Sequence, residues 1–219
     1  MSETSPSSPI EIDIWSDVVC PWCFIGRRRL QKAISNHAGG REVIVRHRAF
    51  QLQPDAREVV RTDEMLATKY KIDKEQVAAM QANVCSIADG EGLCYDLTET
   101  LSGNTVDAHR LILWAEKIGK GDELLEAIYS AYFEKKLPIF SHKDLIAVAT
   151  SIGIDSGAAQ ALLDSNEFAD QVSKDQNLAH QLGANGVPFY VVDMKFAISG
   201  AQPQEVFDQI FADTTPVLQ

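Results

Sequence analysis

Residues 16–26 read SDVVCPWCFIG and place Cys20 and Cys23 on either side of a Pro-Trp dipeptide. Directly before them, residues 10–15 read IEIDIW, in which isoleucine alternates with an acidic residue. A period of two with one apolar side is the pattern of a β-strand with one buried face. The cysteine pair therefore follows a strand.

A helix is predicted to begin at the motif itself. Pro21 suits the first turn of a helix, where its missing N–H has no intrahelical partner to lose. The sequence stays compatible with a helix as far as His37, and glycines 39 and 40 then end it. Residues 42–50, EVIVRHRAF, alternate again and predict a second strand. A strand, helix and strand in this order pair their strands in parallel.

The character of the sequence changes from about residue 58 to residue 182. Apolar residues there recur at spacings of three and four, which predicts a series of helices and no strand of useful length. Thr62, Asp73 and Ser141 are residue types that favour the N-terminal cap of such helices.

The C-terminal part returns to strands. A predicted helix over residues 167–182 is followed by GVPFYVVDMKFAISG at 186–200, which indicates two short strands joined at a polar turn, and a last helix follows Pro203. This order predicts an α/β protein with a thioredoxin-like fold and a large all-helical insertion after the second strand. The predicted parts are a disordered tail (1–9), a thioredoxin-like domain (10–57 and 167–219) and an inserted helical domain (58–166).

Composition excludes several classes of function. The chain has 219 residues, 45% of them hydrophobic, and a net charge of −11. That charge disfavours nucleic acid and anionic membrane surfaces as partners, and no apolar run approaches the ~18 residues that span a bilayer. The start, MSETSPSSP, lacks the basic and apolar segments of a secretory signal. We therefore expect a cytoplasmic protein.

The cysteine pair has the features that thiol–disulfide exchange requires. The chemistry needs a stabilised, accessible thiolate and a second thiol that resolves the mixed disulfide. Cys20 lies at the predicted helix N-terminus, where the helix dipole favours negative charge, so we predict it to be the nucleophile. Cys23, one turn further on, is predicted to be the more shielded, resolving thiol. Pro21 and Trp22 are predicted to tune the thiolate and to supply an apolar surface beside it.

A second feature is the dipeptide Val187-Pro188, just before a predicted strand. In a thioredoxin layout this loop faces the helix N-terminus that bears the cysteines. A cis bond there would present the Val187 backbone to an extended substrate. Only about 5 to 6% of X-Pro bonds in folded proteins are cis, so the dipeptide alone does not establish one.

Other readings of the same residues stay open. A zinc site completed by Cys85 and Cys94 is disfavoured because eight residues separate these two cysteines, more than zinc motifs use. We expect them to be packing residues, with an internal thiol relay as the rival interpretation. No metal or other cofactor is predicted. The arginines at 27–29 are expected to form a solvated helix face.

The quoted motifs together resemble a known family. SDVVCPWCFIG, NTVDAHRL at 104–111, GVPFYVV and SGAQP are similar, in this order, to the FrnE-like branch of the DsbA-family thioredoxin-like oxidoreductases. The resemblance implies a redox-active Cys20–Cys23 pair and a cis-proline at Pro188. Related 2-hydroxychromene-2-carboxylate isomerases and kappa-class glutathione transferases typically carry serine at the attacking position. From the NTVDAHRL segment, the resemblance implies that Asn104 and His109 line the substrate cleft.

The sequence thus predicts a thiol–disulfide oxidoreductase or isomerase that acts through a CPWC motif. Its substrates would be protein or small-molecule disulfides, bound beside Val187, and a thiol reductant or oxidant would recycle the pair. Two alternatives remain: a glutathione-transferase-like or isomerase enzyme that uses a low-molecular-weight thiol, and a redox-switched binding module or chaperone. A monomer and a homodimer are both compatible with the sequence.

Overall fold

The computed structural model describes residues 8–37 and 41–214. Most of the predicted tail and glycines 39 and 40 lie outside the described residues. In chain order the elements are β1 (Ile10–Ser16), α1 (Pro21–Asn36), β2 (Val43–Ala49), β3 (Val60–Arg61), α2 (Thr62–Tyr70), α3 (Lys74–Gly90), β4 (Leu101–Ser102), α4 (Val106–Lys117), α5 (Gly121–Phe133), α6 (His142–Ser151), α7 (Ser156–Leu163), α8 (Ala169–Gln181), β5 (Phe189–Val192), β6 (Phe196–Ser199) and α9 (Gln204–Thr214).

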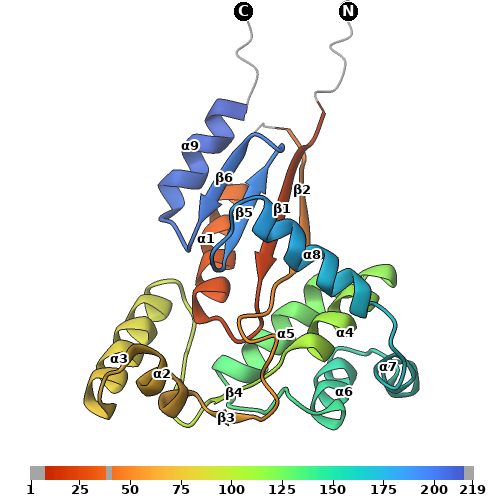
Figure 1. Ribbon diagram of the computed structural model, residues 1–219. Coiled ribbons are helices and arrows are strands. Elements are labelled where there is room, and N and C mark those ends of the chain that lie inside the picture. Colours follow the sequence, from red (N-terminus) through yellow and green to blue (C-terminus); the bar gives the residue numbers. More distant parts are fainter. Residues whose placement is uncertain (1–7, 38–40, 215–219) are drawn as a thin grey trace, which may run out of the picture.

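The main sheet has the strand order β2-β1-β5-β6 (Figure 1). β1 and β2 run parallel, with Ile10 opposite Val43, as the strand, helix, strand opening predicts. β5 runs antiparallel to β1, with Trp15 opposite Phe189, and β6 continues antiparallel to β5. Residues near the two ends of the chain therefore meet in adjacent strands.

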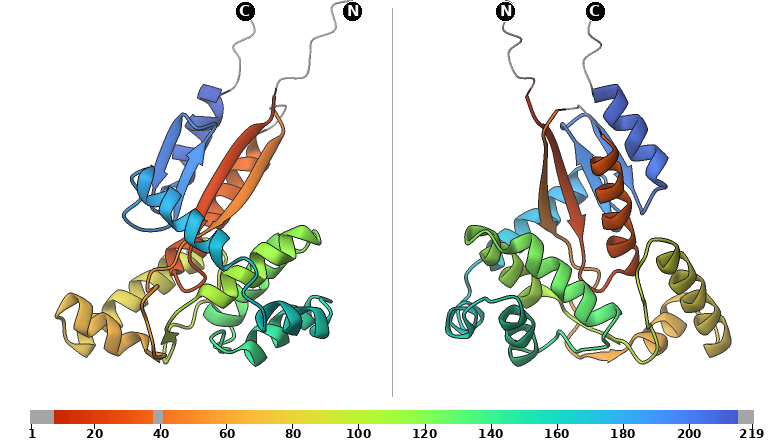
Figure 2. Two further views of the ribbon diagram at one scale, coloured as in Figure 1. Left: turned by 45° about the vertical axis from the view of Figure 1, so that its right-hand side comes forward. Right: turned by 180° about the vertical axis from the view of Figure 1, so that it is seen from behind.

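Helices cover both faces of this sheet. On one face Ile12 of β1 and Tyr190 of β5 pack against α1 and α9. The right-hand view of Figure 2, which is turned by 180° from Figure 1, shows these two helices on the near side of the sheet. On the other face Trp15 and Phe189 pack against α8. The Trp15 indole N–H also donates a 2.7 Å hydrogen bond to the Asp175 carbonyl in α8. The three isoleucines thus share one buried face as predicted, whereas the opposite face is also packed, at Trp15, and the strand has more than the one buried face that the alternation indicated.

The segment between β2 and α8 holds α2 to α7 and lies at the end of the sheet where α1 begins (Figure 1). The predicted helical segment also contains two very short strands, because β3 pairs antiparallel with β4 through Val60 and Ser102. Two residues on each side are too few to leave a period in the sequence.

The predicted helix caps are largely confirmed. Asp73 caps α3 in a capping box with Gln76, and Ser141 caps α6. Thr62 is instead the first residue of α2, and Arg61 occupies the cap position. None of the helices within the described ranges combines the length and apolar character that crossing a bilayer requires.

Candidate active site

Cys20 is the N-cap residue of α1, which begins at Pro21. Its backbone N–H donates to the Asp17 carbonyl (3.1 Å), and the Cys23 N–H donates to the Cys20 carbonyl (3.0 Å). No side chain caps this helix, and its first turn contains no acidic residue. The partial positive charge of the helix N-terminus is therefore left for the Cys20 sulfur, which is the arrangement that favours a thiolate.

The Cys20 sulfur lies 3.5 Å from the carbonyl oxygen of Val187. The thiol donates to this carbonyl across 167 positions of sequence. The peptide bond between Val187 and Pro188 is cis. The structure thus brings together the two segments that the sequence singled out, with the loop before β5 facing the start of α1.

Cys23 lies deeper and contacts Cys20. Its pKa is raised well above the ordinary value, first by burial and then by its hydrogen bond and charge interaction with Cys20. Both cysteines are almost fully buried, at 4% and 3% exposure, so the predicted difference in shielding is not one of exposed area. The difference lies in direction, because Cys20 lines a cleft and Cys23 is not among the lining residues.

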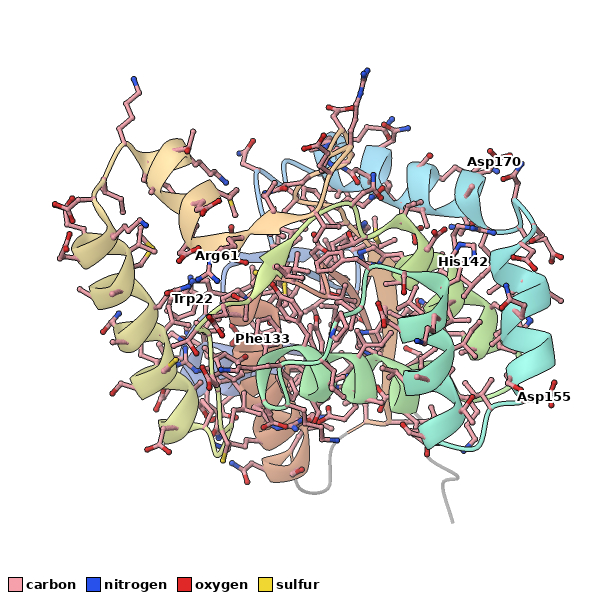
Figure 3. The ribbon with its side chains drawn as sticks, turned by 90° about the horizontal axis from the view of Figure 1, so that it is seen from below. Trp22, Arg61, Phe133, His142, Asp155 and Asp170 are labelled. Carbon is pink, nitrogen blue, oxygen red and sulfur yellow. The ribbon has the colours of Figure 1, made fainter. Side chains whose placement is uncertain are left out.

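This cleft has a volume of about 360 Å³. Its walls come from α1, α2, α3, α5, the short strand β4 and the loop before Pro188, and they include Pro21, Trp22 and Val187. In Figure 3, Trp22 and Phe133 lie left of and near the centre of the molecule, whereas His142, Asp155 and Asp170 lie on its right-hand side. The cleft gives a bound molecule access to the Cys20 sulfur.

An aromatic stack supports the α1 turn from the helical segment. Phe24 stacks on Tyr129 of α5 with ring centroids 4.8 Å apart, and Tyr95 stacks on Phe133 at the same distance. The Tyr95 hydroxyl donates a 2.8 Å hydrogen bond to the Pro21 carbonyl. Sequence reasoning missed Tyr95, which lies in an irregular stretch without a motif.

Gly26, one turn after Cys23, allows α1 to approach the sheet closely. A Cβ at this position would overlap the Tyr190 hydroxyl and would lie 3.2 Å from a ring carbon of Pro188. The Tyr190 hydroxyl is buried and has no hydrogen-bond partner among the described residues. A glycine within a helical pattern was the available signal for this contact.

The arginines at 27–29 are not the solvated face that was expected. Arg27 is only 7% exposed, and its guanidinium pairs with Asp122 (2.8 Å) and Glu126 (3.0 Å) of α5. Arg28 also pairs with Glu126, and Arg29 pairs with Glu91 at the end of α3 (2.7 Å). These ion pairs join α1 to both sides of the helical segment. Their carboxylates lie far away in the sequence, so the local pattern could not reveal them.

Asn104 and His109 are not where the resemblance implied, since neither lines the cleft that holds Cys20. The Asn104 amide oxygen accepts from the Val106 N–H (2.8 Å), and its amide donates to the Pro54 carbonyl (2.6 Å). Asn104 thus fixes the start of α4 against a loop. His109 is 4% exposed, and its Nε2 lies 3.3 Å from an Asp17 carboxylate oxygen.

Asp17 contributes to the site through both its backbone and its side chain. Its backbone carbonyl does hold the turn before Cys20, but its carboxylate is fully buried. The carboxylate accepts a 2.7 Å hydrogen bond from the Leu52 N–H and faces His109. Asp17 also acts on Cys23 in two opposite ways: a hydrogen bond with its backbone lowers the pKa of that thiol, and the smaller effect of its charge raises it.

Neither of the other two cysteines lines the cleft. Cys85 is half-buried against the apolar cluster between α3 and α5, and Cys94 is exposed, with its backbone N–H donating to Glu134. Among residues 8–37 and 41–214, no group of three or more histidine, cysteine or acidic side chains has the geometry of a metal site.

Comparison with known proteins agrees with this geometry. Residues 11–212 match the model of the DSBA-like thioredoxin domain. A crystal structure of a probable DsbA oxidoreductase from Streptomyces coelicolor superposes with a TM-score of 0.88 and 37% identity, over 96% of this chain and 93% of that one. An uncharacterised Bacillus subtilis protein, YwbO, is 23% identical over 93% of this chain and 96% of its own.

A more distant solved structure shares the fold. The cytosolic disulfide reductase DsbM from Pseudomonas aeruginosa, solved with GSH, has a TM-score of 0.64 at 17% identity, over 93% of this chain and 98% of that one. The family model spans nearly the whole described chain, and the S. coelicolor structure matches in both sequence and fold. This chain therefore belongs to the DSBA-like thioredoxin domain family.

Proposed function

We propose that this protein is a thiol–disulfide oxidoreductase in which Cys20 is the nucleophile and Cys23 the resolving thiol. One observation carries the proposal: Cys20 lies at an uncapped helix N-terminus and lines a cleft, while Cys23 contacts it from the buried side. Two thiols in contact can close a disulfide, and only one of them is open to a substrate.

The proposed reaction has two exchange steps. The Cys20 thiolate attacks one sulfur of a substrate disulfide, the substrate S–S bond breaks, and one substrate thiolate leaves. Cys23 then loses its proton and attacks the Cys20 sulfur, which releases the second substrate thiolate and leaves a Cys20–Cys23 disulfide. Two electrons pass from protein to substrate, and an external thiol restores the reduced pair. In the opposite direction the oxidised pair donates its disulfide.

The second step needs a route for the Cys23 proton, because the pKa of that thiol is raised. Asp17 and His109 form a buried pair beside it. We assign His109 to hold the Asp17 carboxylate in position, in place of the substrate contact that the resemblance implied.

Substrate docking is proposed at the loop before β5. Asn185, Gly186 and Val187 line the cleft next to Cys20, and the Val187 carbonyl faces the attacking sulfur. An extended chain could lie along this backbone with its disulfide at Cys20. Protein and small-molecule disulfides both fit such a site.

We place the reaction in the cytoplasm, where a thiol reductant is available to recycle the pair. The fold shared with a cytosolic disulfide reductase supports this location. Either a monomer or a homodimer is compatible with the site, which one chain completes.

The decisive experiment replaces each cysteine in turn. Cys20→Ser should lower the rate of reduction of a neutral small disulfide by at least about 100-fold, whereas Cys23→Ala should trap a mixed disulfide on Cys20 that mass spectrometry detects. Cys94→Ser, which removes an exposed thiol outside the cleft, is the matched control. Undiminished turnover in Cys20→Ser would sink the proposal.

The same variants separate the two alternatives. Turnover by Cys23→Ala with a saturable low-molecular-weight thiol would indicate transferase or isomerase chemistry. Affinity for a partner that changes on oxidation, without catalytic exchange, would indicate a redox-switched binding module or chaperone.

A further inference from the structure

The cleft beside Cys20 is nearly free of charge, although the chain is not. The sequence has 51 charged residues, 20 basic and 31 acidic. Of the 22 residues that line the cleft, Lys69 of α2 is the one charged side chain among the described residues. A cleft without a carboxylate is a distinct environment on a protein with a net charge of −11.

Lys69 is exposed and available to a ligand. Its Nζ lies 5.6 Å from the centre of the Tyr70 ring, and no carboxylate of the described residues forms an ion pair with it. Arg61, a neighbouring cation at the start of α2, is already occupied by Asp63 (2.8 Å) and Glu99 (3.7 Å). Lys69 is thus the ammonium group in the cleft that a bound anion can reach.

The rim of the cleft carries much of the exposed apolar surface of the described chain. Nine large apolar side chains are exposed in the described ranges, and five of them fall between residues 52 and 80: Leu52, Val59, Val60, Tyr70 and Met80. Three of these line the cleft, and the two valines extend the apolar surface along β3 beyond it. Exposed apolar side chains that continue beyond the cleft indicate a binding site for a ligand longer than a small disulfide.

The side of the cleft formed by α2 and α3 is adaptable. Met65 of α2 and Met80 of α3 both line the cleft. Methionine is unbranched and polarisable, so it packs against apolar side chains of different shapes. Such a wall suits substrates that share apolar character and differ in sequence.

We propose that the cleft takes an extended polypeptide segment whose reacting cysteine is flanked by large apolar side chains and a nearby carboxylate, and that Lys69 selects for this carboxylate. The inference rests on the proposed function, since it names the substrate class of the same site. The apolar flanks contact Met65 and Met80, and the carboxylate pairs with the Lys69 ammonium.

The test uses eight-residue peptides in which a single cysteine is blocked as a neutral mixed disulfide with 2-thiopyridine. The Cys20 thiolate displaces thiopyridone, which absorbance follows, and Cys23 then displaces the peptide thiolate as the Cys20–Cys23 disulfide forms. Four peptides are compared: leucine-flanked peptides that carry glutamate, glutamine or lysine, and a serine-flanked peptide that carries glutamine.

For the wild-type protein we expect the leucine-flanked glutamine peptide to react about tenfold faster than its serine counterpart. At low ionic strength the glutamate peptide should react roughly three to five times faster than the lysine peptide, as expected for an exposed ion pair, and 0.5 M salt should abolish this preference. Lys69→Glu should reverse it. Lys143→Glu, which makes the same charge change on α6, should keep the wild-type order.

The outcomes separate the two levels of the proposal. If the wild-type protein does not release thiopyridone from any peptide, the proposed function itself fails. If all four peptides react at the same rate, or if Lys69→Glu keeps the preference for glutamate, the oxidoreductase stands and the assignment of its substrate class is overturned.

Discussion

Two groups of helices between β2 and α8, α4 with α5 and α2 with α3, differ in the fraction of their residues that is buried. In α4, seven of 12 residues are buried, and in α5, eight of 13. By contrast α3 buries three of 17 residues and α2 buries none. The first group packs against the start of α1 as part of the protein core, and the second covers the cleft with its side chains half-exposed.

The cysteine pair lies between these two groups. Tyr129 of α5 is close enough to Cys23 that a thiolate there raises the pKa of the tyrosine, after the larger effect of burial. Cys20 instead lines the cleft beneath α2 and α3. A packed side beside Cys23 and an open cleft beside Cys20 fit the two-step exchange proposed above.

The largest expected effect comes from shortening one leucine in each group. Leu124 of α5 is fully buried, so Leu124→Ala should lower the free energy of unfolding by about 3 kcal/mol. Leu66 of α2 lines the cleft and is half-buried, so Leu66→Ala should cost less than about 1 kcal/mol. Urea unfolding of the reduced proteins measures both. Equal losses would mean that the two groups do not differ in their contribution to stability.

A smaller effect is expected where α1 packs against the sheet. Gly26→Ala should lower the free energy of unfolding by about 2 kcal/mol, because the new methyl group overlaps the Tyr190 hydroxyl. Removing that hydroxyl makes room, so Tyr190→Phe should recover much of the loss in the double variant. By itself Tyr190→Phe should cost little, since the buried hydroxyl has no partner among the described residues. Strictly additive losses would show that the two residues do not compete for the same space.

These contacts also explain how far the sequence could predict the structure. The main strands, α1, the caps at Asp73 and Ser141 and the cysteine motif were predictable because each depends on residues close together in the chain. The contact of Gly26 with Tyr190 and the ion pairs of Arg27 join residues that only the fold brings together. The sequence contained both members of each pair but nothing that identified them as partners.

Asn104 and His109 show the limit of reasoning from a resemblance. The NTVDAHRL segment does lie near the motif, since His109 contacts Asp17, three residues before Cys20. Nearness did not decide which way the side chains point. Whether a residue lines a cleft or supports it from behind depends on the packing of α4, and one motif does not determine that packing.

The smallest expected effect concerns the ion pairs between α1 and α5. The pKa of Asp122 is lowered from its ordinary value of 3.8 by its hydrogen bond to His47 and by the charge of Arg27. A carboxylate with a lowered pKa stabilises the fold above its ordinary pKa and loses this contribution as the pH falls through the folded value. Because the side chain is 70% exposed, Asp122→Asn should cost no more than about 1 kcal/mol at pH 7.

The gap between wild type and Asp122→Asn should therefore narrow as the pH falls below about 4. Urea unfolding at several pH values between 7 and 3 measures this gap. Asp213→Asn, which removes an exposed carboxylate on α9, serves as the control for loss of charge. A gap that stays constant to pH 3 would mean that the carboxylate acts through packing alone. The link between α1 and α5 would then depend on the aromatic stack of Phe24 and Tyr129 and not on these charges.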